Sequence, residues 1–396
     1  MLEVTSFVEI SKISRNIVLF GGGIIAKKTI RKLSRNKIRC IVDNASVEHG
    51  AKVDDILITS PEKLLKDDFI IITSSSVTEI SNQLISIGFQ ENKDFCISPI
   101  LNELLAIQEL ENLEKTLYVT CGAAESKDDL SGGGVYKIKI YGFSVEIEKI
   151  FSGACYGIIK KNSEILFIDT NKGIFSIDSD RIEKKSDLPK GARAHGLSYN
   201  KSKDCYYIAC TNLDSVIELD SKFNCKKSFN LSDKILKNKG EPCHHCNDIT
   251  STGNSVYVSM FSSTGNWKND CFDGCITEFD INSGKRIGDV CVSLFMPHNV
   301  KIIDGDMHAL DSLPGHLRFN NLSIQGTFPA FTRGLDYKDG FYYIGQSKNR
   351  NHAKVLGVSN NISIDCGIII FNPINKISRF IQLPHTIGTV HHVLVV

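Results

Sequence analysis

Two patterns, a glycine-rich turn between a strand and a helix and a motif that recurs six times, predict the fold class of this chain. They indicate an α/β Rossmann-like domain over residues 1–112, followed by an all-β six-bladed β-propeller over residues 113–396 that the C-terminal strand closes. The length of 396 residues agrees with two domains, because single hydrophobic cores rarely serve chains beyond ~250–300 residues.

Charge and cysteine content limit the partners and the location of the protein. The chain has 46 Lys and Arg residues against 45 Asp and Glu residues, so it lacks the basic excess that attracts nucleic acid or acidic membranes. Its 13 cysteines are odd in number and irregularly spaced, which favours reduced thiols over disulfides. The start has no export-signal pattern, and no apolar run approaches the ~18 residues that span a bilayer. We therefore expect a cytoplasmic protein without nucleic-acid or membrane partners and of undetermined oligomeric state.

The N-terminal pattern runs strand, glycine turn, helix, strand and acid. Residues 16–20 form an apolar run, residues 21–26 (GGGIIA) follow at once, and a helical pattern leads to a second apolar run. In a nucleotide-binding unit, glycines let the backbone approach a diphosphate at the helix N-terminus, and an acid about 20 residues further on binds the ribose. Gly21, Gly23 and Asp43 are thus the predicted contacts of a nucleotide or nucleotide-sugar. The alternative is a Rossmann-like module that only packs or oligomerises.

Six later segments share one form, in which a polar residue precedes a small, amide or acidic residue and then an aliphatic run. They begin at Tyr156, His195, Asn247, His298, Arg333 and His391. In most copies a turn and a second strand follow, as expected of four-stranded blades. The sixth copy lies at the C-terminus, and the three strands that it lacks precede the first copy, between residues 117 and 150. A blade shared in this way removes the open edge of the sheet circle.

The six starting residues should form a ring at the propeller axis, since the first strand of each blade lines the central channel. We interpret all six as candidate catalytic residues. His195, His298 and His391 fall on alternate blades, and three converging imidazoles can hold Zn²⁺, Fe²⁺ or Mn²⁺ with positions left open for substrate. Neutral histidines can instead serve as acid and base near pH 7. Arg333 suits a carboxylate or phosphate, and Tyr156 suits proton transfer. The simpler alternative is a wet channel lined by polar side chains.

A further motif, residues 243–246 (CHHC), directly precedes one of the ring positions. One Cys-x-x-Cys pair can begin a zinc site or act as a redox pair, but no second pair at zinc-finger spacing accompanies it. We interpret the motif as the mouth of a blade, from which His245 reaches the ring and Asp248 orients a neighbour. The long loop that carries Arg350 and His352 suits an anionic ligand, or else a charged, solvated surface.

Two groups of sequence phrases resemble known families. The phrases HHCNDI, MPHNV, FTRGLDY, GQSKNR and CGIIIFNP, over residues 240–375, resemble a bacterial family of conserved hypothetical β-propeller proteins that has no assigned activity. This resemblance implies a propeller with a shared site at Asn247, Asp248, His298, Arg333 and Gly334. The phrases FGGGIIAKKTI, IVDN and FIIITSSS, over residues 15–100, resemble small Rossmann-like domains attached to bacterial sugar-modifying enzymes, which implies a polysaccharide or nucleotide-sugar setting.

The sequence favours an enzyme that modifies a carbohydrate or nucleotide-sugar, as a lyase, epimerase or isomerase. An acid–base ring, with or without a divalent metal, would remove a proton next to a carbonyl or carboxylate. A non-catalytic propeller that binds a sugar or an anionic ligand is the alternative. A scaffold is the third hypothesis, and the polar ring argues against it, because scaffold propellers bind partners through their rims.

Overall fold

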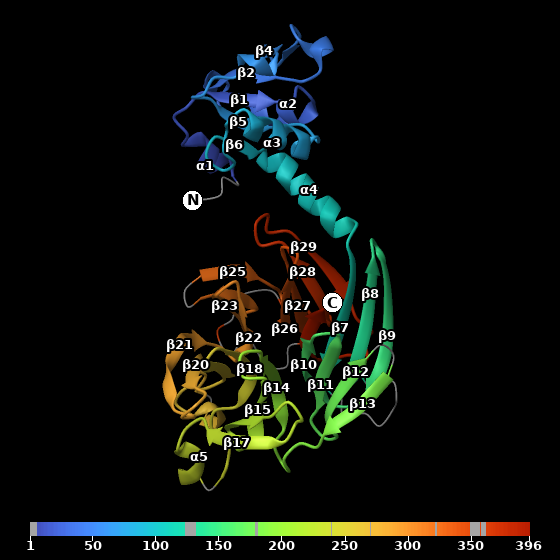
Figure 1. Ribbon diagram of the computed structural model, residues 1–396, viewed down its shortest axis with the longest axis vertical. Helices are drawn as coiled ribbons and strands as arrows, with labels where there is room; N and C mark the ends of the chain where they lie inside the picture. Colours follow the sequence, from blue (N-terminus) through green and yellow to red (C-terminus); the bar gives the residue numbers. More distant parts are fainter. Residues whose placement is uncertain are drawn as a thin grey trace. The chain divides into compact units, whose positions relative to one another are not determined.

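The computed structural model describes residues 6–122, 132–178, 181–238, 240–269, 271–320, 323–348, 357 and 362–396. The chain divides into two compact units, Met1–Glu111 and Asn112–Val396. Figure 1 traces both units by sequence colour. Within the described part of the chain, no helix is long and apolar enough to cross a membrane.

The N-terminal unit is built on a six-stranded sheet with the order β3-β4-β2-β1-β5-β6. Its strands are β1 (Ile17–Phe20), β2 (Ile38–Val42), β3 (Lys52–Val53), β4 (Ile56–Thr59), β5 (Phe69–Ile72) and β6 (Phe95–Ile97). Its helices are α1 (Phe7–Ser11), α2 (Ile24–Ile30), α3 (Val77–Ser86) and α4 (Pro99–Glu111), with 3₁₀ turns η1 (Arg35–Lys37), η2 (Ser46–Glu48) and η3 (Pro61–Lys63). The central strands β1 and β5 are apolar and buried along their whole length, as parallel strands covered on both faces require.

The predicted fold class has to be corrected for this unit. The protein is predominantly β, and the propeller takes up most of the chain. A Rossmann-like domain places a helix after each strand. Here η2 and the short strand β3 connect β2 to β4, and only η3 lies between β4 and β5. Those connections are too short and too polar for a helix to form a buried face.

The predicted nucleotide contacts are not supported either. The carboxylate of Asp43 accepts the backbone N–H of Ala45 at 2.9 Å and that of Gly22 at 2.8 Å, so both of its oxygens are engaged and it links the loop after β2 to the glycine turn. Gly21 has the positive φ of 110° that this turn needs, and Gly23 only precedes α2. Because α2 has seven residues, its N-terminus offers little of the dipole on which a diphosphate depends.

The second unit is a six-bladed β-propeller, which confirms that prediction. Five blades are β10–β13 (Cys155–Lys161, Glu164–Asp169, Gly173–Asp178, Arg181–Ser186), β14–β17 (Ala194–Asn200, Cys205–Cys210, Ser215–Leu219, Cys225–Asn230), β18–β21 (Cys246–Thr252, Ser255–Met260, Gly274–Asp280, Arg286–Leu294), β22–β25 (His298–Ile303, Asp306–Asp311, His316–Phe319, Ser323–Thr327) and β26–β29 (Phe331–Lys338, Phe341–Ser347, Gly367–Phe371, Ser378–Gln382). The sixth has the order β30-β7-β8-β9 (Val390–Val395, Glu114–Cys121, Gly134–Tyr141, Ser144–Ser152). The loops add α5 (Lys234–Lys237), η4 (Thr211–Leu213) and η5 (Trp267–Asn269).

The first strands of the blades meet around one axis, as Figure 1 shows at the centre of the propeller. Each first strand contacts the first strands of both neighbouring blades, from β10 through β14, β18, β22 and β26 to β30 and back to β10. Apolar cores lie between neighbouring blades. One of them packs Tyr207 and Val216 of one blade against Val258 and Phe279 of the next. All 13 cysteines lie in the described residues, and none forms a disulfide.

Removal of residues 390–396 is expected to open the propeller. Strand β30 pairs with β7, and its Val390, Val393, Leu394 and Val395 are each less than a tenth exposed. Each such side chain contributes about 1.5–3 kcal/mol on burial, against a total stability of about 5–15 kcal/mol. We expect the truncated protein to aggregate through its open strand edge, as measured by size-exclusion chromatography.

The matched control changes the same segment without touching the sheet. Gly388 has no atom within 4 Å of the position that a Cβ would take, so Gly388→Ala should remain soluble and should melt as the wild type does. A truncated protein that stays monomeric with a cooperative thermal transition would contradict the closing role of β30.

Candidate functional site

The six predicted ring residues occupy equivalent positions in their blades. In every blade, one aliphatic residue of the first strand pairs with the middle of the second strand. The pairs are Ile158 with Phe167, Leu197 with Ile208, Ile249 with Val258, Val300 with Ala309, Leu335 with Ile344, and Val393 with Val119. Each ring residue lies two positions before the first member of its pair. A register shift accompanies it in all six strands, and such a bulge re-aims a side chain out of the regular alternation.

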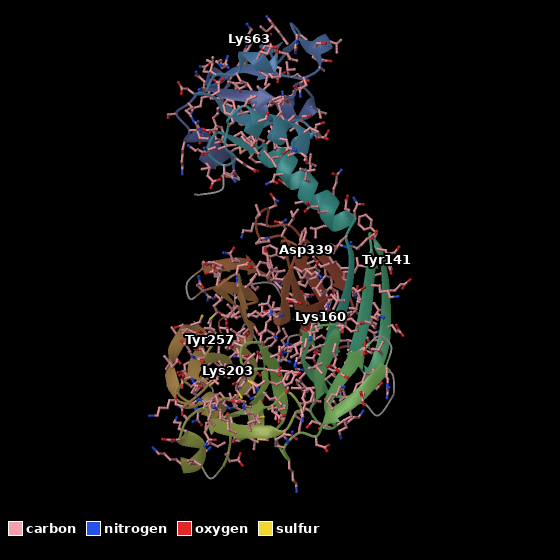
Figure 2. The ribbon with its side chains drawn as sticks, in the orientation of Figure 1. Lys63, Tyr141, Lys160, Lys203, Tyr257 and Asp339 are labelled. Carbon is pink, nitrogen blue, oxygen red and sulfur yellow. The ribbon has the colours of Figure 1, made fainter. Side chains whose placement is uncertain are left out.

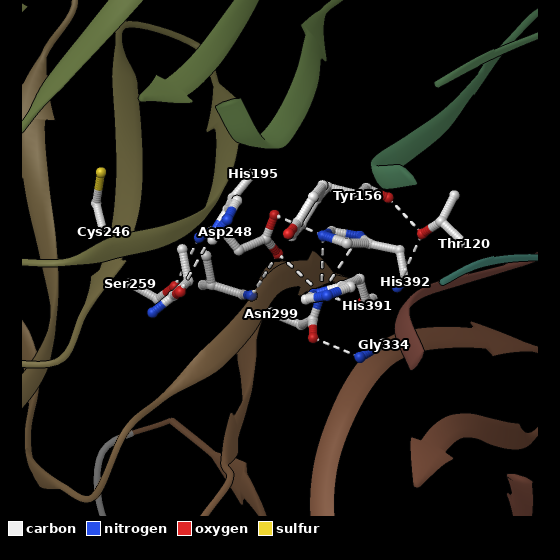
Figure 3. A network of polar contacts seen from close by, with 12 residues as sticks. Thr120, Tyr156, His195, Cys246, Asp248, Ser259, Asn299, Gly334, His391 and His392 are labelled. Carbon is white, nitrogen blue, oxygen red and sulfur yellow. Dashed lines mark hydrogen bonds and ion pairs between the residues drawn. The ribbon is translucent and has the colours of Figure 1, made fainter. Parts of the chain in front are cut away.

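Four of the ring residues contact one another directly. The ring of Tyr156 stacks on His195 with centroids 4.2 Å apart and planes 12° apart, and it also meets His391 at 4.1 Å. The centroids of His195 and His391 are 6.0 Å apart. Nδ1 of His195 lies 3.4 Å from Oδ1 of Asn247. Tyr156 is therefore held between two imidazoles at the centre of the cluster, and Figure 3 shows these side chains with their neighbours.

The other two ring residues sit among aromatic side chains. His298 lies edge-on between Phe261 and Phe331, with centroid distances of 5.3 and 5.4 Å. The guanidinium of Arg333 lies 4.9 Å over the ring of Phe331. His245, from the segment before β18, stacks on Phe261 at 4.3 Å, and its centroid is 6.4 Å from that of His195. His245 therefore lies next to the ring, as its sequence position suggested.

The imidazoles of the cluster are neutral near pH 7. Burial holds the pKa values of His195, His298 and His391 well below the ordinary 6.5, and the charge of Arg333 lowers all three further. Burial also lowers the pKa of His245 to about 3, with help from Arg193 and Arg333. The permanently charged side chains that act on these imidazoles, among the described residues, are the guanidinium groups of Arg193 and Arg333, which favour an anionic ligand.

The hydrogen bonds of Asn247 determine which nitrogen of His195 carries the proton. Nδ2 of Asn247 donates to the carbonyls of His245 and Pro297, at 3.2 and 3.4 Å, so Oδ1 is left as the acceptor. Nδ1 of His195 must therefore carry the proton and donate it to Asn247. Nε2 of the neutral ring then holds a lone pair, and it is buried without a hydrogen-bond partner among the described residues. His195 is accordingly the best-prepared base of the cluster.

The predicted metal site at His195, His298 and His391 is not supported. Among the described residues, no group of three or more His, Cys, Asp or Glu side chains is placed to hold a metal ion. Nδ1 of His298 faces the carbonyl of Met296 and the hydroxyl of Ser312, both at 2.9 Å, so only its Nε2 could serve as a ligand. Its ring lies edge-on between two phenylalanines, whereas the rings of His195 and His391 both contact Tyr156.

A second axial tier lies one residue further along each first strand. It consists of Gly157, Gly196, Asp248, Asn299, Gly334 and His392. The three glycines let neighbouring strands approach closely. A Cβ on Gly196 would come within 2.7 Å of the Ile249 nitrogen, and one on Gly334, which has φ +79°, within 2.9 Å of the Val393 nitrogen. Asp248 and His392 also line a pocket of about 300 Å³.

Asn299 ties the second tier to the ring. Its Oδ1 accepts the N–H of Gly334 at 2.5 Å, and its Nδ2 donates to Oδ2 of Asp248 at 3.3 Å and to the carbonyl of His391 at 3.4 Å. One buried amide therefore holds the peptide bonds that follow both Arg333 and His391 (Figure 3). Asp248 completes the network with its Oδ1 3.3 Å from Nε2 of His392.

Several residues of the site were missed in the sequence. These are Arg193, Phe261, Trp267, Phe331, Asn299 and His392. Arg193, His245 and Met296 all stand two positions before a ring residue and all have positive φ, of 42°, 53° and 54°. The same backbone conformation therefore precedes the ring residue in three consecutive blades. Because an arginine, a histidine and a methionine adopt it, no common sequence motif marks these positions.

The cysteine pair and the long loop are the remaining candidates from the sequence. Cys243 and Cys246 are both buried thiols, and burial raises the pKa of Cys246 well above its ordinary value, which argues against a redox pair. The loop residues Arg350 and His352 lie outside the described residues.

Fold and site together define a six-bladed β-propeller with a cationic, histidine-rich cluster at its axis. Residues 139–396 match the family described as domain of unknown function DUF4915, and the chain belongs to this family. The match confirms the resemblance of the propeller to an uncharacterised family. Residues 13–95 match a second model, described as C2185-like, N-terminal.

No curated protein matches the chain. Three solved structures are similar to its propeller. A protein of unknown function from Bacteroides caccae is 15% identical, with 72% of this chain and 99% of that chain covered and a TM-score of 0.49. A gluconolactonase from Xanthomonas campestris is 9% identical, with 69% and 89% covered and a TM-score of 0.46. The calcium-binding protein regucalcin from Agrobacterium tumefaciens is 10% identical, with 60% and 74% covered and a TM-score of 0.40. Similarities of this size carry no inference about activity.

Proposed function

We propose that the axial cluster binds a small carbohydrate that carries an anionic group, and that it moves a proton on that molecule as a lyase, epimerase or isomerase does. The observation that carries the proposal is the neutral, buried His195, whose Nε2 lone pair has no hydrogen-bond partner among the described residues and lies in the field of Arg333. A desolvated lone pair beside a fixed positive charge suits the removal of a proton next to a carboxylate.

The roles of the other side chains follow from the same geometry. Arg333 and Arg193 would bind the anionic group and stabilise the negative charge that forms when the proton leaves carbon. His195 would take that proton at Nε2. Tyr156 or His391 would return one to the opposite face in an epimerase or isomerase, or would protonate the departing group in a lyase. The ring residues Tyr156, Arg333 and His391 are partly exposed, so a ligand has access to them.

One observation favours a non-catalytic binding protein instead. An imidazole whose pKa is held far below 7 is a weak base and gains little from taking a proton. A bound anion offsets this effect, because its negative charge neutralises Arg333 and raises the pKa of His195. The enzyme therefore requires its ligand to activate its base, whereas a binding protein requires no such change.

Solvent-deuterium exchange distinguishes these two functions. Aldonic and uronic acids would be tested for binding by calorimetry, and each ligand that binds would then be incubated with the protein in D₂O. An acid–base enzyme incorporates deuterium at the carbon next to the carboxylate, which proton NMR detects. Binding without exchange would assign the protein to the non-catalytic class, and failure of every anionic carbohydrate to bind would overturn the proposal.

A further inference from the structure

A second concave surface lies on the loops that flank β18 and β19. It is a pocket of about 410 Å³, formed by the segment before β18 and the loop that joins β19 to β20. Three lysines and three asparagines line most of it: Lys234, Lys237, Lys268, Asn238, Asn266 and Asn269. We call it the lysine pocket.

The lysine pocket carries a net positive charge. The ammonium of Lys234 donates to two neutral oxygens, the carbonyl of Thr264 and Oδ1 of Asn266, and no carboxylate of the described residues pairs with it. Within the described part of the chain, Lys237 forms no ion pair. Lys268 pairs with Glu241 at 3.0 Å, but both side chains are about half exposed, and such a pair contributes only about 0–1 kcal/mol. Among the described residues of the pocket, three ammonium groups thus face one loosely held carboxylate.

The segment 243–245 contributes one residue to this pocket and another to the axial cluster. The buried carboxylate of Asp214 accepts the backbone N–H groups of Cys243 and His244. The ring of His244 is held in turn by the carbonyl of Ser262 at 2.8 Å and the hydroxyl of Ser232 at 2.6 Å. Because both ends of this segment are fixed, the pocket exists without rearrangement of the chain.

The lysine pocket and the axial cluster are close together. Cys243 lines the lysine pocket, and His245, two residues further on, contacts the axial histidine His195. Two residues of extended chain span at most about 7 Å. Trp267 joins the two sites as well, since it lies between two lining residues of the pocket and contacts the ring of His245 at 4.5 Å.

We propose that the lysine pocket is a phosphate-binding subsite, and that the carbohydrate at the axial cluster is a sugar phosphate whose phosphate reaches it. This inference rests on the proposed function for the position of the sugar. Flexible ammonium groups around an open, wet pocket suit a phosphate dianion, which they bind as point charges. The guanidinium groups at the axis then remain available for the carboxylate or carbonyl end of the ligand.

The only tryptophan of the chain provides the measurement. Trp267 borders the pocket, so its fluorescence should change saturably when inorganic phosphate is added at constant ionic strength. The double variant Lys234→Ala/Lys268→Ala should bind phosphate at least tenfold more weakly. The matched control is Lys190→Ala/Lys203→Ala, which removes two exposed lysines from the same propeller and should bind as the wild type does. Lys203, labelled in Figure 2, lies in the turn between β14 and β15.

Three further outcomes separate this inference from the proposed function. Phosphate binding that survives in the double variant but disappears in Arg333→Met would place phosphate at the axis, and would overturn the subsite while the axial proposal stands. The absence of any saturable response in the wild type would overturn the subsite as well. Finally, a sugar phosphate should bind more tightly than the same unphosphorylated sugar acid, and this difference should vanish in the double variant. If the difference persists there, the phosphate does not reach the lysine pocket.

Discussion

In the variant His195→Gln, deuterium exchange into the bound carbohydrate is expected to fall by about 10²–10⁴-fold, the usual contribution of one general base. Affinity for the ligand should change little, because the two arginines proposed to bind its anionic group, Arg193 and Arg333, remain in place. Glutamine keeps a polar group beside Asn247 but has no lone pair of comparable basicity. A lower exchange rate with unchanged affinity would therefore indicate the loss of proton transfer and not unfolding of the protein.

His308→Gln is the matched control for this prediction. His308 is also a buried histidine of the propeller, and burial lowers its pKa too, but it lies off the axis with Nδ1 2.9 Å from the hydroxyl of Tyr342. Its replacement should leave the exchange rate within a few-fold of the wild type. An exchange rate in His195→Gln that matches the control would show that another group is the base.

The propeller and its axial ring were accessible from the sequence because both depend on local repetition. A polar residue followed by a small or amide residue and an aliphatic run marks the same strand in every blade, so the equivalent places of His195 and His298 follow from alignment of the copies. The N-terminal unit was misjudged for the opposite reason. Its glycine turn resembles a nucleotide-binding turn locally, but the carboxylate of Asp43 is engaged by backbone N–H groups of that turn and of its own loop.

The contacts between blades could not be predicted in this way. Asn299 acts on the peptide bonds beyond Arg333 and His391, which are 34 and 92 residues away along the chain. The lack of support for the predicted metal site has a similar cause. Equal positions in six blades do not give equal surroundings, since His298 lies between Phe261 and Phe331 while His195 and His391 lie against Tyr156.

Replacement of Arg333 by methionine is expected to weaken the binding of anionic carbohydrate and to change how stability depends on pH. A charge-assisted hydrogen bond contributes about 1.5–3 kcal/mol, so the affinity should fall by about tenfold or more. Methionine keeps an apolar chain in place of the arginine stem and removes the guanidinium that lies over Phe331. Arg379→Met, on the outermost strand β29 with its guanidinium 5.2 Å over Phe143, is the matched control and should bind the ligand normally.

The effect on stability has a definite sign. In the folded wild type, burial and then Arg333 keep the pKa values of His298 and His391 well below 6.5, the ordinary value that these groups regain on unfolding. Below pH 6.5 the unfolded chain therefore binds protons that the folded chain refuses, and each such histidine lowers the free energy of unfolding by about 1.4 kcal/mol per pH unit. Stability is thus fully present above pH 6.5 and falls as the pH decreases toward the folded pKa values. Without the charge of Arg333 those values rise, so when urea unfolding is followed from pH 7 downward, the loss of stability should level off at a higher pH in Arg333→Met than in the wild type or Arg379→Met. Burial, the larger cause, remains, so the loss is reduced and not abolished.

Two outcomes would contradict this prediction. Parallel pH profiles for all three proteins would mean that Arg333 does not act on the axial imidazoles. An unchanged affinity would mean that the anion binds elsewhere.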